Sequence, residues 1–547
     1  MSGHHTCTDG SEDHSRRSFV KKLLGIAVLP ALIPANSCKT TPKKITGNIA
    51  GANHTTGHLL RNIASLPEVS ETLQTNILIA GGGIAGLSAK RMLHQHNVPD
   101  VMMVEMDKDT GGNSTFGKNE YSAYPWGAHY LPIPEPCNTE LTDFLHSAGV
   151  ITGFNNEGLP VYNEYHLCHS PEERLYINGY WQPGIVPEYG IGDIDRKQIS
   201  DFFKLVNNLK NEKGDDGLHA FSIPVDRSSK DIKFTQLDNI SFAQYLAQKG
   251  FTSEYLLWYL EYCCKDDYGC RLNDTSAWAG LHYFASRRGA ADNAESSAVL
   301  TWPEGNGFLM KALRAQCGGN IHTNMLVYSV HTHTEGAEVL CYDVTRKKSV
   351  RIIANKLLLS TPQFVNKHLL GEAGDRLPVY DIVSYSPWMI ANITFRNLPQ
   401  AKGETLCWDN VMYGQPSVGY VYANHQDLRM KEKGVITYYL PIAEQPPKTA
   451  RNNAYSKSYE YWQELVLKEL NYAHPGVADY VDHMDIWLWG HGMIRPVKGY
   501  IWGYARQKAM RNINDSIFFA HSDLSGISIF EEAFYQGIRA AKEMTST

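Results

Sequence analysis

The sequence lacks a long apolar run, and it lacks an excess of basic residues. None of its apolar stretches reaches the roughly 18 residues that a membrane-spanning helix needs. The formal net charge is −6 at pH 7 over 547 residues, whereas a nucleic-acid-binding surface requires a basic face. Hydrophobic residues make up 43% of the chain, enough for a large buried core. The sequence therefore indicates a globular protein without a nucleic-acid partner.

Paired-cysteine motifs are absent as well. The ten cysteines include no CxxC and no CxxCH, which excludes a zinc ribbon, a thioredoxin site and covalently attached haem. Cys263, Cys264 and Cys270 cluster, and we interpret them as buried thiols rather than as disulfide partners. His331 and His333 share one face of a predicted strand, but no third and fourth ligand accompanies them. We therefore predict no metal site.

The first 37 residues resemble an export signal. Residues 15–21 (SRRSFVK) are similar to the twin-arginine motif, and an apolar stretch follows over residues 23–33. Small residues precede Cys38, which suits either signal cleavage or acylation of Cys38 as in a lipoprotein. We interpret residues 1–37 as a signal peptide and residues 38–72 as a tether. We expect an exported protein, periplasmic or anchored to the membrane by lipid; the alternative is a cytoplasmic protein with a frayed basic N-terminus.

The strongest motif is a glycine-rich turn between a strand and a helix. Residues 76–80 (NILIA) predict a short buried strand, and residues 81–86 (GGGIAG) fit the pattern GxGxxG. A second apolar strand, residues 101–105 (VMMVE), ends on Glu105, 19 residues after the last glycine of the motif. This combination predicts a dinucleotide site, in which Glu105 accepts hydrogen bonds from ribose hydroxyls and disfavours a 2′-phosphate.

Each position of the motif has a physical role. Gly81 permits the tight turn, Gly83 lets the backbone approach a pyrophosphate, and Gly86 lets the helix pack closely against the strand. Ile84 and Ala85 stand at the start of the helix, where unpaired N–H groups and the helix dipole favour an anion.

A second glycine turn connects the sequence to a known family. Gly112 and Asn113 belong to a Gly-Gly-Asn turn that begins six residues after the second strand, and residues 517–520 predict a late strand that leads to Asp523 and Gly526. Here the sequence resembles the flavin-containing amine oxidase superfamily, in which Arg or Lys usually follows the Gly-Gly pair. The resemblance implies FAD as the cofactor, with these four residues among its contacts. It also implies that the final helix points its N-terminus at the flavin ring.

Two middle segments extend this resemblance. Residues 302–307 (WPEGNG) precede a helix and then a strand predicted over residues 321–330, in which the backbone of Val327 would contact adenine; residues 357–362 (LLLSTP) resemble a strand that returns under the cofactor. The implied fold class is α/β, a Rossmann-like FAD-binding domain interleaved with a mixed-sheet and helical substrate domain, amine-oxidase-like. The FAD-binding domain would comprise residues 73–150, 295–375 and 480–547, and the substrate-binding domain residues 151–294 and 376–479.

The resemblance also places candidate catalytic residues. The backbone amides of Gly127 and Ala128 would lie along the flavin edge, and His129 would act as a base or orient the substrate; a backbone-bonded core histidine is the alternative. Trp489 and His491 form a Trp-x-His-Gly motif that is similar to bacterial spermidine dehydrogenases. An aromatic side chain there would steer an amine onto the flavin by packing and cation–π attraction.

These features imply an exported FAD-dependent oxidoreductase that oxidises a polyamine-like amine by hydride transfer to flavin N5. Oxygen, a quinone or a haem protein would accept the electrons; the relatives can also hold haem b, but no motif in this sequence supports it. Two alternatives remain: a desaturase or isomerase of a lipophilic polyene, and a lipoprotein whose structural flavin serves a binding module. Asp266, Asp267 and Glu304 could receive the ammonium ends of a polyamine, although a solvated acidic face is favoured for the Asp pair.

Overall fold

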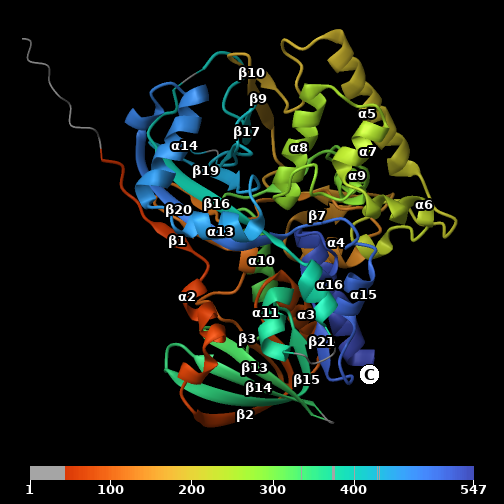
Figure 1. Ribbon diagram of the computed structural model, residues 1–547, viewed down its shortest axis with the longest axis vertical. Coiled ribbons are helices and arrows are strands. Elements are labelled where there is room, and N and C mark those ends of the chain that lie inside the picture. The colour runs from red at the N-terminus through yellow and green to blue at the C-terminus, as the bar shows by residue number, and fades with distance from the viewer. Residues whose placement is uncertain are drawn as a thin grey trace, which may run out of the picture. The chain divides into compact units, whose positions relative to one another are not determined.

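The computed structural model describes residues 44–333, 336–371, 376–399, 401–427, 429 and 431–546 (Figure 1). The chain from Ile45 onward forms one compact unit. The predicted signal peptide, residues 1–37, and the predicted acylation site, Cys38, lie outside the described residues. In the part that the structure describes, no helix is long and apolar enough to span a bilayer.

A seven-stranded sheet carries the predicted dinucleotide motif. Its strand order is β12-β3-β2-β15-β14-β13, with β21 paired to the end of β15. The strands are β2 (Val69–Ala80), β3 (Val101–Val104), β12 (Ile321–His322), β13 (Met325–His333), β14 (Gly336–Asp343), β15 (Lys348–Leu359) and β21 (Ile517–Phe519). The pairs among β12, β3, β2, β15 and β21 are parallel, whereas β13 and β14 add an antiparallel edge. This arrangement confirms the predicted Rossmann-like α/β domain.

Helices bury both faces of this sheet. Ile77 and Ile79 pack into one core and Leu78 and Ala80 into another, as the alternation of side chains along a strand requires. The first core contains α3 (Ile84–Gln95), α4 (Thr139–Ser147), α10 (Gly307–Ala315) and α16 (Phe530–Ser546); the second contains α11 (Gln363–Leu370), α12 (Leu377–Ile382) and α15 (Tyr504–Met510). Close packing of α16 on α3 depends on Gly537, because a Cβ there would collide with the carbonyl oxygen of Ala85.

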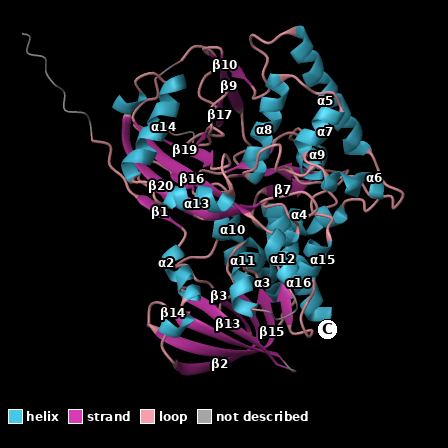
Figure 2. Ribbon diagram, in the orientation of Figure 1, coloured by secondary structure: helices cyan, strands magenta, loops and turns pink. Residues whose placement is uncertain are grey.

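An eight-stranded sheet forms the other half of the molecule (Figure 2). Its order is β1-β20-β16-β19-β18-β17-β9-β10. The strands are β1 (Ile49–Gly51), β9 (Glu173–Ile177), β10 (Tyr180–Pro183), β16 (Tyr385–Phe395), β17 (Asp409–Met412), β18 (Tyr420–Tyr422), β19 (Gly434–Pro441) and β20 (Val481–Ile494). One face packs against a helical insertion of α5 (Asp193–Asn211), α6 (Ile232–Thr235), α7 (Phe242–Gln248), α8 (Glu254–Tyr268) and α9 (Ala277–Ala285). The other face packs against α14 (Tyr459–Ala473) and the end of α13 (Pro447–Tyr455).

Short strand pairs connect the two halves. They are β4 (Phe116–Lys118) with β5 (Ala123–Pro125), β6 (Tyr130–Pro132) with β11 (Val299–Thr301), and β7 (Ile151–Phe154) with β8 (Pro160–Tyr162). The clustered thiols Cys263, Cys264 and Cys270 are free and buried, as predicted. His331 and His333 are both exposed.

Three predicted boundaries differ from the structure. Residues 45–72 are not a tether: β1 pairs in parallel with β20, α2 (His54–Gly57) follows, and β2 begins at Val69. β20 lies in the eight-stranded sheet, although the prediction assigns residues 480–494 to the same domain as the glycine turn. The strand predicted over residues 321–330 is split into β12 and β13 because Asn324 adopts a left-handed conformation, with φ +58°.

Candidate functional site

One cavity of about 1110 Å³ collects nearly all of the predicted site residues. Its walls include Gly81, Gly83, Ile84, Ala85, Glu105, Gly112, Asn113, Gly127, Ala128, His129, Val327, Trp489, His491 and Asp523. Gly86 and Gly526 do not line the cavity. Gly86 allows a close backbone contact, and Gly526 has a positive φ that turns the chain. The volume exceeds that of an ordinary small-molecule pocket, so it can hold a dinucleotide together with a further small molecule.

The glycine turn at the start of α3 leaves open space beside an uncapped helix N-terminus. Gly81 has φ +107°, a conformation that favours glycine. A Cβ on Gly86 would overlap the carbonyl oxygen of Gly81, so this residue sets the close contact of helix and strand. A Cβ on Gly83 would meet no atom within 4 Å, and the residue lines the cavity. No side chain caps α3, which leaves the N–H groups near Ile84 and Ala85 free for an anion.

Glu105 and Val327 line the part of the cavity for which the sequence predicts ribose and adenine contacts. Glu105 Oε2 accepts from the Gly82 N–H at 2.6 Å and Oε1 from the Asp107 N–H at 2.8 Å. Burial raises the pKa of Glu105 to about 7, although these backbone hydrogen bonds oppose the rise. The Met325 N–H donates to the carbonyl of Glu105 at 2.8 Å, which brings the start of β13 beside it. The pairing of β13 with β14 shifts register just after Val327, at the cavity wall.

Asn113 connects the cofactor turn to β20. Its Nδ2 donates to the carbonyl oxygen of Gly492, and its own carbonyl accepts from the Ala128 N–H at 3.0 Å. Residue 127 must be glycine because a Cβ there would overlap the Asn113 carbonyl oxygen. Asn113 thus lines the cavity as predicted, but its side-chain amide is occupied by protein backbone.

Asp523 is 1% exposed and is held by three neighbours. Its Oδ2 accepts from the Gln363 N–H at 2.8 Å and from the Tyr385 hydroxyl at 2.5 Å, and Oδ1 lies 3.0 Å from His521 Nδ1. Burial alone would raise the pKa of Asp523, but His521 and these hydrogen bonds hold it below its ordinary value. The carboxylate is therefore ionised at the edge of the cavity. Gly526, with φ +80°, turns the chain from this point toward α16.

The predicted catalytic histidines are neutral. Burial lowers the pKa of His129 to about 4 and that of His491 to about 3. The His129 ring lies 4.6 Å from the ring of Tyr439, and the His491 ring stacks on Phe364 at 4.0 Å. Trp489 Nε1 donates to the carbonyl of Trp126 at 2.6 Å, which fixes the indole in the wall. These side chains form a largely aromatic wall that shapes the site without adding charge at pH 7.

The structure corrects the interpretation of the Asp pair on α8. Asp266 and Asp267 line the cavity rather than a solvated face, because the end of α8 packs against the segment after α9. Asp267 forms an ion pair with Arg287 at 3.0 Å and accepts from the Tyr130 hydroxyl at 3.1 Å. Glu304, the other acid considered, lies outside the cavity lining and pairs with Lys311.

A third carboxylate, not identified from the sequence, completes this acidic end. Glu531, in the first turn of α16, is 5% exposed and lines the cavity. Neither Asp266 nor Glu531 receives a hydrogen bond or ion pair from another side chain in the described part of the chain. Burial raises the pKa of both to about 7. Three carboxylates and one guanidinium, that of Arg287, thus line this end of the cavity. Residues 266, 287 and 531 form no sequence motif, so sequence analysis did not group them.

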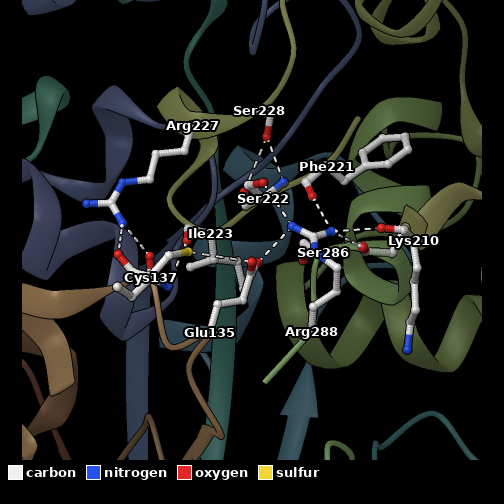
Figure 3. Close-up of polar contacts among 12 residues, drawn as sticks. Glu135, Cys137, Lys210, Phe221, Ser222, Ile223, Arg227, Ser228, Ser286 and Arg288 are labelled. Atoms are coloured by element: carbon white, nitrogen blue, oxygen red, sulfur yellow. Dashed lines mark hydrogen bonds and ion pairs between the residues drawn. The ribbon is translucent and has the colours of Figure 1, made fainter. Parts of the chain in front are cut away.

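The wall near Ile223 is fixed by a half-buried arginine (Figure 3). Arg288 Nη1 donates to the carbonyl of Phe221 at 2.7 Å, and Nη2 donates to Ser222 Oγ at 2.9 Å and to Glu135 Oε1 at 2.7 Å. The loop that carries Ile223 is therefore held by charge-assisted hydrogen bonds on both sides of the guanidinium.

Comparisons with known proteins agree with this architecture. Residues 79–148 match the description of an NAD(P)-binding Rossmann-like domain. No curated protein sequence matches the chain. Among solved structures, putrescine oxidase bound to putrescine has a TM-score of 0.64 and 15% identity, covering 87% of this chain and 100% of that one.

Two further solved structures have the same fold. Cyclohexylamine oxidase from Brevibacterium oxydans IH-35A has a TM-score of 0.60 and 12% identity, covering 86% of this chain and 98% of that one. A CLA-producing fatty acid isomerase from P. acnes has a TM-score of 0.60 and 15% identity, with the same coverage of 86% and 98%. The chain therefore has the α/β fold that these two amine oxidases and the isomerase share, as the sequence predicted.

Proposed function

We propose that this chain is an FAD-dependent oxidoreductase that oxidises an amine with a second cationic group, such as a polyamine. The observation that carries the proposal is a single cavity with a dinucleotide-type glycine turn in one part and an excess of buried carboxylates in another. The first feature suits the phosphates of FAD, and the second suits a cationic substrate.

The residues that would hold FAD fit its chemistry. The open space beside Gly83 and the uncapped N-terminus of α3 would receive the diphosphate. Glu105 would accept from ribose hydroxyls, and the strand at Val327 would border the adenine. FAD, when bound, supplies an acceptor for the two electrons and the hydride of the substrate C–H bond.

The acidic end supports an amine as substrate. Among the described residues, no cationic side chain donates a hydrogen bond to Asp266 or Glu531, and an ammonium group would supply one. At the reacting end, the aromatic wall of Trp489 and Tyr439 would favour an uncharged amine by desolvation. The neutral His129 and His491 would orient that end without repelling it. A polyamine satisfies both requirements, because one nitrogen can stay protonated while another is neutral.

The alternative substrate class is a lipophilic chain. The fold match to a fatty acid isomerase favours it. Buried carboxylates without partners oppose it, because they would be left against hydrocarbon at a cost of several kcal/mol. A carboxylate-bearing substrate would in addition meet the like charge of Asp266 and Glu531. The other alternative is a purely structural flavin. It gives no reason for buried carboxylates such as Asp266 and Glu531 to line the cavity.

The test is an anaerobic visible spectrum of the purified protein before and after addition of spermidine. We expect a bound flavin whose visible band bleaches with spermidine and stays unchanged with linoleate. Bleaching by linoleate alone would replace the amine proposal with the lipophilic one, and a protein that purifies without flavin would contradict both.

We also propose that the protein is exported through its twin-arginine motif. The support is the sequence of residues 15–21 and the apolar stretch that follows. Replacing both arginines by lysine (Arg16→Lys with Arg17→Lys) should leave the protein in the cytoplasmic fraction. Unchanged fractionation of this variant would contradict the proposal.

A further inference from the structure

The segment of residues 45–61 joins the two halves of the molecule beside the cavity, and we call it the strap. Its first part, β1, pairs with β20 in the eight-stranded sheet. Its second part, α2 and the turn after it, lies between α13 and β3 (Figure 1). The His54 ring lies 5.1 Å from the ring of Tyr455 in α13, and a Cβ on Gly57 would lie 3.6 Å from Met106 Sδ, just after β3. The strap therefore reaches from the substrate half to the part of the cavity with the predicted ribose and adenine contacts.

The strap contributes to a cationic part of the cavity wall. Arg61 at its end lines the cavity, as do Lys367 and Lys448 and Arg451 on α11 and α13. None of these four side chains has an ion pair with an acid among the described residues. Arg61 and Arg451 are close enough for the charge of Arg61 to help lower the pKa of Arg451, after the larger effect of burial. Several cations thus face one space without a counterion.

The glycine turns of the cofactor site contain no such charge. Residues 81–86 and 111–115 include no lysine or arginine, and the side chain of Asn113 is bonded to the backbone of β20. Neutral N–H groups at a helix N-terminus can bind a phosphate, but a diphosphate carries two negative charges. A cationic side chain elsewhere on the wall would add charge neutralisation that these turns do not supply.

We propose that Arg61 of the strap and Arg451 of α13 bind the diphosphate of the dinucleotide together with the N-terminus of α3. The proposal rests on the proposed function, since it requires FAD in the cavity. Arg451 is positioned for this role because its Nη1 donates to the carbonyl of Gly490 at 2.9 Å, which holds the guanidinium against β20. Arg61 lines the same cavity from the strap. Bound cofactor would therefore hold the strap in place through its contact with Arg61.

The experiment measures the release of FAD from the purified holoenzyme, followed by the rise in flavin fluorescence after dilution. We expect Arg61→Gln and Arg451→Gln each to speed release by about tenfold, the effect of losing one charge-assisted hydrogen bond. Arg61→Lys should recover part of the retention because it restores the charge. Raising the salt concentration should speed release from the wild type more than from the double variant, since salt screens exposed charges.

The matched control is Lys204→Gln, which removes one positive charge from α5 and does not line the cavity. It should release FAD at the wild-type rate. Equal release from the wild type, both arginine variants and the control would overturn this inference while leaving the proposed function intact. Faster FAD release from Lys204→Gln as well would show that the overall charge of the protein controls release. That result would also overturn this inference. Wild-type protein without flavin would overturn both.

Discussion

Burial decides the chemistry of individual carboxyl groups in this protein. Asp266 and Asp267 are adjacent in sequence, yet only Asp267 has the guanidinium of Arg287 as a partner. The sequence pattern of two acids on a helix favours solvation, and the structure reverses that interpretation because the end of the helix faces an internal cavity. The cationic partner that Asp266 lacks is the one a substrate can supply.

Replacing Asp266 should weaken substrate binding. We expect Asp266→Asn to raise KM for spermidine by about tenfold with a smaller change in kcat, because a charged hydrogen bond to a distal ammonium is lost. Steady-state kinetics with an artificial electron acceptor measure this. The control is Glu304→Gln, whose carboxylate pairs with Lys311 outside the cavity lining and should leave KM unchanged. An unchanged KM in Asp266→Asn would argue against the acidic end as a substrate site.

Glu531 should make the ligand-free protein less stable at high pH. Burial raises its folded-state pKa from 4.5 to about 7. The folded state therefore holds a proton that the unfolded state has lost between these pH values, so stability falls as pH rises from about 4.5 to about 7. Glu531→Gln removes this penalty, which is at most about 3 kcal/mol for such a shift.

The measurement is denaturant unfolding of the wild type and Glu531→Gln without substrate, at pH 4.5 and pH 8. The variant should gain stability over the wild type at pH 8 relative to pH 4.5. A stability difference between wild type and variant that does not change with pH would show that folding does not raise the pKa of Glu531.

At the scale of elements, the start of α3 has one glycine that lines the cavity and one that makes a packing contact. Gly83 faces open cavity, whereas Gly86 faces the backbone of Gly81. Both are glycines of one motif, and the sequence predicts the close helix–strand contact at Gly86 because GxGxxG is a local pattern of strand, turn and helix; the pyrophosphate contact at Gly83 stays a prediction.

Gly83→Val should therefore abolish flavin binding without unfolding the protein. Its side chain would occupy the space beside the helix N-terminus, so we expect a colourless protein with an unchanged circular dichroism spectrum. Gly86→Ala is the informative contrast: its methyl group would collide with the backbone, and we expect a loss of thermal stability. Retained flavin in Gly83→Val would place the diphosphate elsewhere.

Elements that depend on distant partners were predicted less well. Residues 45–72 have the composition of a linker, yet β1 forms because β20 offers it an edge that lies more than 400 residues away in sequence. β12 and β13 were predicted as one strand because their residues are continuously strand-like. The left-handed Asn324 separates them, and of the two pieces it is β12 that forms the ladder with β3.

At the scale of the whole molecule, the site lies where two sheets from interleaved segments meet. The seven-stranded sheet and the turns that follow its strands contribute Glu105 and Gly83. The eight-stranded sheet contributes Trp489 and His491. The acidic end comes from the helical insertion and from α16. Because these pieces come from sequence-distant segments, the distribution of charge in the cavity is a property of the assembled fold.

The sequence by itself determined the glycine turn between strand and helix, the Rossmann-like α/β fold class and nearly all of the candidate residues that line the cavity. These features are encoded by local patterns, since turn glycines, alternating apolar strands and helix starts depend on neighbours a few residues away. Only the tertiary structure decided that Asp266 and Glu531 share a cavity and that the strap brings Arg61 to its wall. It also decided that His129 and His491 are neutral. Burial and pairing between residues hundreds of positions apart are set when the two halves pack, and no local pattern records them.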